Sequence, residues 1–350
     1  MPRPALILFA GLGCMAAAQV LWFVALKPLR PVVPATAEAG AGLPPGEFAG
    51  TLLLGGFRGL ACDLLWMRAV GAKESGRHYE SVALAETIAA VQPRFAQVWE
   101  FLAHDLAYNL AYEAEDRGAK FAWFRAGIAA NVQGCLRNPG NERILRNLAW
   151  MFNHKGDDFH AEIDAAAWGG QLDPVIAGAN ALIPAHRRVE PLGTRTGLSN
   201  FAIAARLYAL SVALAEATAY DQPHIIPRMV PLAWEFDGNV LLGQGRHREA
   251  LGSWIASIAA WQEIAERAAR STGLTKALIE ESFQRNEGRL RRRAGDLARR
   301  LAADPAVGEA LASAIDQRHL AEAKALLAQA GWKDHQAGSV IRWLDEGGAL

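Results

Sequence analysis

The densest group of potential metal ligands in the sequence lies between residues 154 and 162. It comprises His154, Asp157, Asp158, His160 and Glu162, and imidazole with carboxylate is a ligand set that divalent transition metals accept. The spacing matches neither the HExxH motif nor an EF-hand loop. The segment is expected at a turn between two helices, where Asp157 or Asp158 would cap the second helix. We therefore predict a capped, solvated turn and keep a metal-dependent enzyme at 154–162 as a less favoured hypothesis.

The three cysteines offer little further chemistry. Cys14, Cys62 and Cys135 form no CxxC pair and no zinc-type spacing with histidine, which excludes a disulfide-dense scaffold. Cys62 and Cys135 would form a disulfide only outside the cytoplasm, and buried free thiols are the favoured alternative. The sequence also lacks a nucleophile elbow and a strand-linked glycine-rich phosphate loop. We therefore predict a non-enzymatic protein with no catalytic residues, no metal and no cofactor.

Composition and charge exclude two broad classes. Of the 350 residues, 51% are hydrophobic, so the chain can bury a large core and is not globally disordered. It has 36 Lys and Arg against 36 Asp and Glu, which gives a formal net charge of zero. A generally basic chain that binds nucleic acid is therefore not expected.

The first 30 residues are predicted to be a membrane anchor. Residues 5–26 (ALILFAGLGCMAAAQVLWFVAL) carry no charge, and a helix of this length spans about 33 Å, enough to cross the bilayer core. A signal peptide cleaved near 16–18 is the main alternative, but the apolar run continues beyond that point. A lipoprotein cleavage before Cys14 is disfavoured because the apolar residue usual three positions earlier is missing. We predict an uncleaved anchor that contacts the lipid bilayer through residues 5–26.

The charges that flank the anchor nearly balance. Arg3 precedes it, while Lys27 and Arg30 follow it, so the positive-inside rule gives only a small preference. The large C-terminal part favours a single-pass membrane protein with its folded part outside the cytoplasm, and the reverse orientation is the alternative. Residues 31–47 (PVVPATAEAGAGLPPGE) are rich in Pro, Ala and Gly and predict a semi-extended tether.

From residue 48 onward the predicted fold class is all-α. Apolar residues recur at helical spacing, and Gly and Pro fall between the apolar segments. Residues 201–219 (FAIAARLYALSVALAEATA) approach the length of a second membrane span, but Arg206 would cost about 2.5–3.5 kcal/mol at the centre of a bilayer. We expect this segment to be a buried helix. The one long loop is expected over residues 175–196.

Three segments repeat one pattern of large and small residues. They are Trp99, Leu102, Ala103 and Leu106; Leu145, Leu148, Ala149 and Phe152; and Trp234, Gly238 and Leu241. The small member of each set lets two helices approach closely, and Gly76 and Gly245 are placed to end helices. The pattern resembles the tetratricopeptide repeat, a helix pair that buries its apolar face by stacking on its neighbours. We predict a tetratricopeptide-like solenoid over residues 48–272 and capping helices over residues 273–350.

The N-terminal half resembles a group of bacterial membrane-anchored tetratricopeptide proteins. The residues that carry the resemblance are GGFRGL at 55–60, DLLWMRA at 63–69, QPRF at 92–95, Val98, Trp99, Asn109, AWMF at 149–152 and HKG at 154–156. The resemblance covers about residues 50–165. It implies the anchor and the repeat architecture, and it implies no particular biochemical activity.

Positions beside the packing positions of such repeats are expected to face a groove. Counting from the matched positions, these are Asp63, Trp66, Gln97, Glu100, His104, Arg143, Arg146, Trp150, Asn153, Glu235 and Asn239. Arg143 and Arg146 would receive an acidic segment or a C-terminal carboxylate of a partner, and Trp150 beside them is a typical hot-spot residue. The alternative is that both arginines pair within the chain, with Glu142 or Glu100.

Three functional hypotheses follow. The favoured one is a membrane-tethered scaffold that binds protein partners or assembles an envelope complex. The second is a structural subunit of a membrane complex that binds through its flanks and through its anchor, where Gly11 and Gly13 would permit close helix packing. The third is the metal-dependent enzyme at 154–162. In addition, the arginine run 289–293 would contact anionic lipid or an acidic partner, but pairing within the chain is favoured.

Overall fold

The architecture of the folded part comes from a computed structural model. It describes residues 58–159, 162–163, 165–193, 198–220, 222–223, 225–269, 273–302 and 304–329. Over these ranges the secondary structure consists of helices and turns without a strand, which confirms the all-α class. The predicted anchor at 1–30, the tether at 31–47, the first half of the motif GGFRGL, His160 and residues 330–350 lie outside the described residues.

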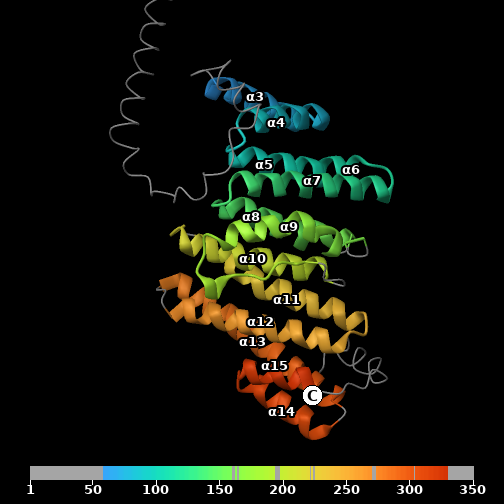
Figure 1. Cartoon of the computed structure of the whole chain (residues 1–350), viewed down its shortest axis with the longest axis vertical. Helices are drawn as coiled ribbons and strands as arrows, with labels where there is room; N and C mark the ends of the chain where they lie inside the picture. The colour runs from blue at the N-terminus through green and yellow to red at the C-terminus, as the bar shows by residue number, and fades with distance from the viewer. Residues whose placement is uncertain are drawn as a thin grey trace, which may run out of the picture. The chain divides into compact units, whose positions relative to one another are not determined.

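The helices follow one another along the chain with short connections (Figure 1). The first half contains α3 (Arg58–Glu74), α4 (His78–Val91), α5 (Ala96–His104), the π-helix η5 (Asp105–Leu110), α6 (Ala111–Glu113), α7 (Arg117–Arg137), α8 (Glu142–Trp150), the π-helix η6 (Met151–Lys155), the 3₁₀-helix η7 (Gly156–Phe159) and α9 (Ala165–Asn180). The second half contains the 3₁₀-helix η8 (Ala185–Arg187), α10 (Asn200–Ala217), α11 (Ile225–Gly243), α12 (His247–Ala269), α13 (Gly273–Leu301), α14 (Pro305–Asp316) and α15 (Leu320–Gln329).

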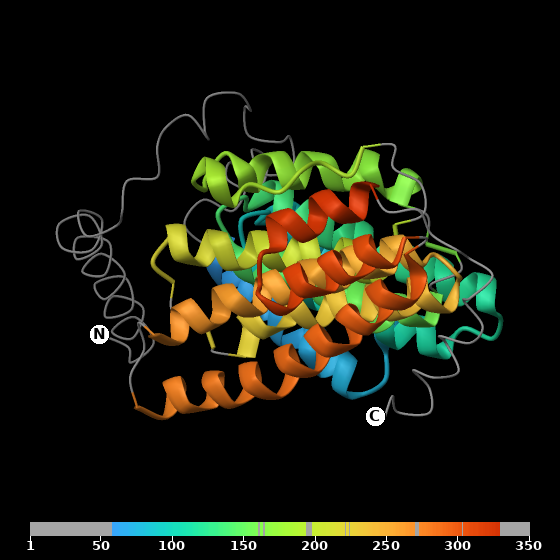
Figure 2. The ribbon, with the colours of Figure 1, turned by 90° about the horizontal axis from the view of Figure 1, so that it is seen from below.

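Within this folded unit the helices stack in chain order. α3 packs on α4, α5 on α7, α7 on α8 and α9, and α8 on α10. The order continues from α10 to α11, α12, α13 and α14, and a view along the stack shows successive helices overlying one another (Figure 2). This is the arrangement expected when helices bury their apolar faces against sequence neighbours.

Glycines end two of the helices as predicted. Gly76 follows α3 with φ +72°, and Gly245 follows α11 with φ +76°, a left-handed conformation that glycine adopts without a Cβ clash.

Asp116 and Asn141 are the N-cap residues of α7 and α8. The Asp116 side chain accepts a hydrogen bond from the Ala119 backbone, and the Asn141 side chain accepts from Arg143 and Ile144, which supplies partners for amides that lack one within the helix.

The expected loop at 175–196 starts later than predicted. α9 continues through Pro174 to Asn180, so its last turns occupy residues assigned to the loop. The chain then runs back along α9, where Asp173 accepts from the amides of Leu192 and Gly193 at 2.7 and 3.0 Å. The glycines and prolines that suggested a longer loop are accommodated inside the helix and in this return segment.

Two large apolar clusters form the interior. The first extends from Cys62 to Ala233, and the second joins α11 and α12 to α13, α14 and α15. In the second cluster, Gly238 lies against the fully buried indole of Trp254, which agrees with the prediction that a small residue there permits close approach. The C-terminal helices therefore share a core with the preceding helix pair.

α10 is the one helix in the described part of the chain that is long and apolar enough to cross a membrane. Length and composition do not distinguish a span from the core helix of a soluble protein. Here most α10 residues are buried within the fold, among them Ile203, Leu207 and Leu214. This burial confirms the expectation for residues 201–217 as an interior helix.

Candidate functional site

Four of the predicted groove residues line one cavity. Its volume is about 390 Å³, and its polar side is formed by Glu100 on α5, Arg143, Arg146 and Asn147 on α8, and Tyr208 on α10. Its apolar side is formed by Trp150 on α8 and by Ile225, Ile226 and Met229 at the start of α11. We call this space the Trp150 cavity. Its size falls in the range of ligand-binding cavities in proteins.

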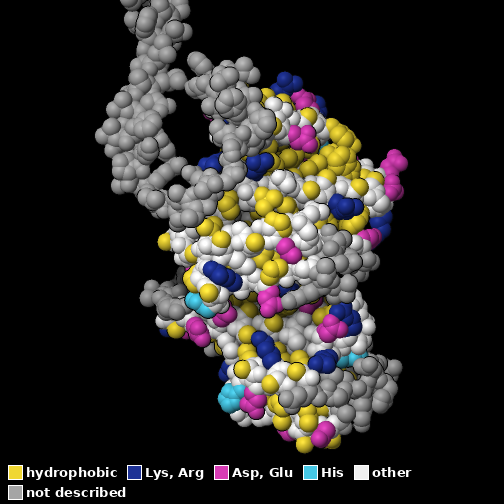
Figure 3. All heavy atoms as spheres, in the orientation of Figure 1, with side chains coloured by type: hydrophobic (Ala, Val, Ile, Leu, Met, Phe, Trp, Pro, Cys, Tyr) yellow, Lys and Arg dark blue, Asp and Glu magenta, His cyan; other side chains and the backbone are white. Residues whose placement is uncertain are grey.

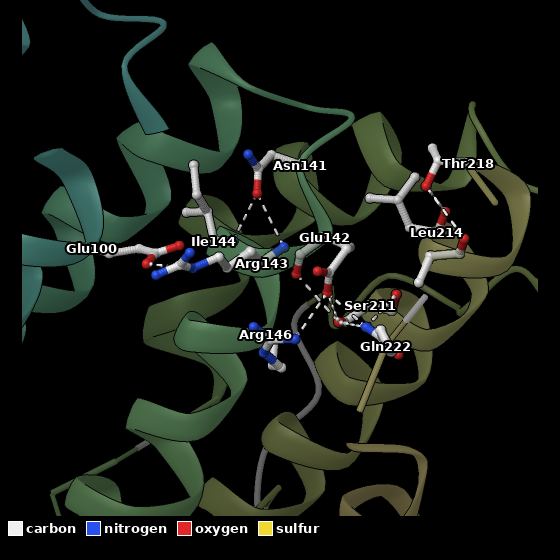
Figure 4. Close-up of polar contacts among 11 residues, drawn as sticks. Glu100, Asn141, Glu142, Arg143, Ile144, Arg146, Ser211, Leu214, Thr218 and Gln222 are labelled. Carbon is white, nitrogen blue, oxygen red and sulfur yellow. Dashed lines mark hydrogen bonds and ion pairs between the residues drawn. The ribbon is translucent and has the colours of Figure 1, made fainter. Parts of the chain in front are cut away.

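The position of α8 explains why its residues converge. Asn141 fixes the first turn by accepting from the amides of Arg143 and Ile144 at 3.0 and 3.2 Å. From there, Arg143, Arg146 and Trp150 follow at spacings of three and four residues, which places their side chains on one face of a helix. Figure 4 shows Arg143 and Arg146 on this helix between Glu100 and Ser211.

Both cavity arginines pair within the chain. Arg143 Nε donates to Glu100 Oε2 at 3.0 Å, and Arg146 Nη1 donates to Glu142 Oε2 at 3.4 Å (Figure 4). These are the internal pairs that the sequence offered as the alternative to partner binding. Each bond uses one of the five N–H donors of a guanidinium, and no other side-chain hydrogen bond joins either arginine to the described residues.

Glu142, the partner of Arg146, also accepts hydrogen bonds from two further side chains. Its carboxylate accepts from Gln222 Nε2 at 2.6 Å and from Ser211 Oγ at 3.4 Å, and its side chain is buried. This network links α8 to α10 and to the chain before α11 (Figure 4). Because Glu142 has these further donors, the position of Arg146 is fixed while most of its own donors stay available.

Two buried polar atoms at the cavity lack partners. The Tyr208 side chain is 1% exposed, and neither its hydroxyl nor Glu100 Oε1 has a hydrogen-bond partner among the described residues. Burial raises the pKa of the Tyr208 phenol, so the hydroxyl keeps its proton. Burial also raises the pKa of Glu100, an effect larger than the opposing influence of Arg143. An unsatisfied buried polar group destabilises a fold by about 1–3 kcal/mol, which a bound ligand would relieve.

The apolar side of the cavity is partly open to solvent. Trp150 is 41% exposed and Ile225 is 50% exposed. Large apolar side chains that remain exposed beside convergent polar groups are typical of binding sites. The Trp150 cavity is therefore suited to a ligand with an apolar body and a polar head.

A row of stacked rings extends from the cavity across α8, η6, α5 and η5. Trp150 stacks on His154 with ring centroids 4.8 Å apart, Tyr108 lies 5.9 Å from His154, and His104 stacks on Tyr108 at 4.7 Å. We call these four residues the ring row. Burial raises the pKa of Tyr108 to about 12, and burial together with the charge of Lys73 lowers the pKa of His104.

The ring row joins equivalent positions of two repeats. Tyr108 and His154 are 46 residues apart, as are Leu102 and Leu148 of the repeated pattern. Only His104 and Trp150 were among the predicted groove residues. Tyr108 and His154 each follow one of these by four residues, so helical periodicity contained the signal, but the sequence analysis assigns His154 to a turn and not to the groove.

The remaining predicted groove residues do not line the cavity. Asp63 and Gln97 are exposed, and Trp66 packs against Phe95 and Phe101, with centroids 5.3 and 4.9 Å away. Asn153 and Asn239 are partly buried.

The prediction that Glu235 lies on an open surface is wrong, because the side chain is buried. It is 4% exposed and accepts from Arg289 at 2.7 Å. The cause is long-range, because α13 supplies the cation that a buried carboxylate requires.

The described side chains of the segment 154–162 have partners within the chain. Asp158 pairs with Lys155 at 2.8 Å, Glu162 pairs with Arg117, and His154 belongs to the ring row. In the part of the chain that the structure describes, no three His, Cys, Asp or Glu side chains are grouped closely enough to hold a metal ion. The carboxylates of Asp158 and Glu162 are thus engaged by cations of the chain itself.

Cys62 and Cys135 are separate, buried free thiols. Burial raises the pKa of both, so neither is activated as a nucleophile. This agrees with the favoured alternative to a disulfide.

Comparison of the chain with protein-family models, with curated proteins and with solved structures finds no match.

Proposed function

We propose that this chain is a membrane-tethered helical-repeat scaffold that binds a segment of a partner protein in the Trp150 cavity. The observation that carries the proposal is the combination of unused guanidinium N–H groups, an unpartnered Tyr208 hydroxyl and an exposed apolar wall in one space. Such a combination is what a hot spot for a peptide requires. Among the described residues, no three His, Cys, Asp or Glu side chains form a group that could hold a metal ion.

The tether and the membrane location belong to the same proposal. The uncharged run at 5–26 and the Pro- and Ala-rich stretch at 31–47 support a single-pass anchor in a bacterial inner membrane, with the repeats held away from the bilayer on its periplasmic side. The repeats are of the tetratricopeptide type in this proposal, on the strength of the spacing around Trp99, Leu145 and Trp234. In such an arrangement the scaffold assembles an envelope complex.

The test is co-purification with matched variants. The full chain is purified from its native membranes in mild detergent as the parent protein, as Trp150→Ala and as Phe236→Ala, and co-purifying proteins are quantified by mass spectrometry. Phe236 is a similarly exposed aromatic residue outside the cavity, with 43% exposure. We expect a stoichiometric partner that Trp150→Ala removes and Phe236→Ala retains. A partner retained by both variants would contradict the proposal.

A replacement of residues 5–26 by an unrelated membrane span distinguishes this scaffold from the second hypothesis, a subunit that assembles through its membrane anchor. A scaffold that binds through the cavity keeps its partner after this exchange. A subunit that assembles through its anchor loses the partner, because the specific packing of its membrane helix is removed.

A further inference from the structure

We propose that the Trp150 cavity recognises the C-terminal residue of its partner, an apolar residue with a free α-carboxylate. This inference deepens the proposed function and rests on it. It starts from three residues that line the cavity and carry hydrogen-bond donors, Arg143 and Arg146 with their guanidinium groups and Tyr208 with its unpartnered hydroxyl. Charged and neutral N–H and O–H donors in one cavity suit a single oxyanion.

The charges of the site favour a carboxylate over a phosphate. Arg143 and Arg146 are balanced by Glu100 and Glu142 at 3.0 and 3.4 Å, so the site carries little net charge. A ligand group with one negative charge would accept a hydrogen bond from each arginine, and its repulsion from the two glutamates would be modest. A phosphate would bring a second negative charge close to both carboxylates, which disfavours it.

The unpartnered acceptor provides the second point of recognition. Glu100 Oε1 is buried and accepts no hydrogen bond from the described residues, so it is available to the backbone N–H of a bound peptide. A carboxylate, a backbone N–H and an apolar side chain occur on the same residue only at the C-terminus of a chain. An internal acidic residue presents its carboxylate on a side chain, which is where the apolar group must be in this site.

The apolar wall provides the third point. Trp150, Ile225, Ile226 and Met229 line the same cavity as the polar groups, and Trp150 and Ile225 are 41% and 50% exposed. The side chain of a terminal Leu, Ile or Phe would remove this apolar surface from water, which favours binding. Carboxylate, amide and apolar side chain thus match the three parts of the cavity.

The probe is a short fluorescein-labelled Ser/Gly peptide that ends in Phe with a free carboxylate. Two further peptides change one feature each, one ending in Phe amide and one ending in Ser with a free carboxylate. Fluorescence anisotropy is measured with the purified full chain in detergent. We expect each change to weaken binding at least about tenfold, since the first removes the hydrogen bonds to a charged group and the second removes the apolar anchor.

Matched variants assign the effect to the cavity. Arg146→Gln and Tyr208→Phe should bring the affinities for the acid and the amide close together, while Arg125→Gln, an exposed arginine of α7 outside the cavity, should preserve the difference. Tyr208→Phe is informative because it removes only the unpartnered hydroxyl, so a purely structural role would leave discrimination unchanged.

Three outcomes would overturn the inference. They are equal affinity for acid and amide, absence of binding by all three peptides, and displacement of the acid peptide by inorganic phosphate at lower concentrations than by acetate. If any of these occurs while Trp150→Ala still removes the native partner, the C-terminal recognition is wrong and the scaffold function stands. If the native partner is also insensitive to Trp150→Ala, the proposed function fails as well.

Discussion

The arginines of α13 and those of the Trp150 cavity occupy opposite chemical situations. On α13, Arg291 contacts both Glu287 and Asp316, and Arg299 contacts Asp296 and Glu309. Arg143 and Arg146 each donate one side-chain hydrogen bond and lie beside exposed apolar surface. On α13, where arginine is most frequent, these arginines pair with carboxylates of the same chain, as the sequence analysis favours. Unused donors beside apolar surface mark a binding site better than charge density does.

Figure 3 shows how charged side chains are distributed over one face of the molecule. Over the described residues on the face shown, basic and acidic side chains are interspersed and do not gather into a large patch of one sign. Long-range attraction of a charged partner would need such a patch. Arg143 and Arg146 are each paired with a carboxylate, so the proposed recognition in the Trp150 cavity relies on short-range hydrogen bonds and apolar contact.

The largest test of the contrast compares two tryptophans. Trp254 is fully buried in the C-terminal cluster, and Trp150 is 41% exposed. Trp254→Ala should lower the free energy of unfolding by about 3–5 kcal/mol because it leaves a cavity in a packed core. Trp150→Ala should lower it by less than about 1 kcal/mol. Urea unfolding of the full chain in detergent, followed by helical circular dichroism, measures both. Equal losses would mean that Trp150 serves mainly in packing.

A second test concerns the carboxylates of α13. Glu287 is buried and accepts two hydrogen bonds from Arg318, at 2.9 and 3.2 Å, while Glu281 is exposed and pairs with Arg285. Glu287→Gln should lower the free energy of unfolding by about 2–3 kcal/mol, because the charged partners lose a buried counter-charge but are themselves partly exposed. Glu281→Gln should change it by less than about 0.5 kcal/mol. The same urea titrations decide, and a small effect of Glu287→Gln would show that α13 does not depend on its ion pairs.

A third test uses two glycines of α11. A methyl group at Gly238 would overlap the Trp254 indole, whereas a methyl group at Gly243 meets no atom within 4 Å. Gly238→Ala should therefore destabilise the chain by about 1–3 kcal/mol through overpacking. Gly243→Ala should stabilise it by up to about 1 kcal/mol, because alanine favours the helix. Thermal unfolding of both variants compares the two directly, and the same sign for both would contradict the close helix contact.

The smallest test is the pH dependence of the cavity. Because the folded chain raises the pKa of Glu100 above its ordinary value of 4.5, the folded state binds the proton more tightly than the unfolded state. The contribution of Glu100 to stability is greatest below pH 4.5 and is lost as pH rises through the raised pKa. Relative to the parent chain, Glu100→Gln should thus become more stable as pH increases over this interval.

Arg143→Gln provides the control for this pH dependence. It removes a positive charge that lowers the pKa of Glu100, so the pH at which the stability declines should move upward. Urea unfolding at a series of pH values from 4.5 to neutrality would detect both effects. An identical pH dependence for the parent chain and Glu100→Gln would assign it to other groups.

Local features of the sequence predicted much of the fold and part of the site. Helical periodicity placed Arg143, Arg146 and Trp150 on one face, and the repeated small residue at Gly238 marked a close helix contact. Tyr208 and Ile225 could not be assigned to the cavity in this way, because α10 and α11 reach α8 only through long-range packing. The burial of Glu235 depends on α13 for the same reason.

The two π-helical segments have a consequence for the phase of the helices that contain them. They start at Asp105 and Met151, 46 residues apart, and a π turn bonds residue i to i+5 where an α turn bonds i to i+4. Each thus acts as an inserted residue. If either segment wound as regular α-helix without losing a residue, the rest of its helix would rotate by roughly 100°, or a little over a quarter turn. Such a chain would keep its composition and its helices, but the two pairs of rings would no longer face each other.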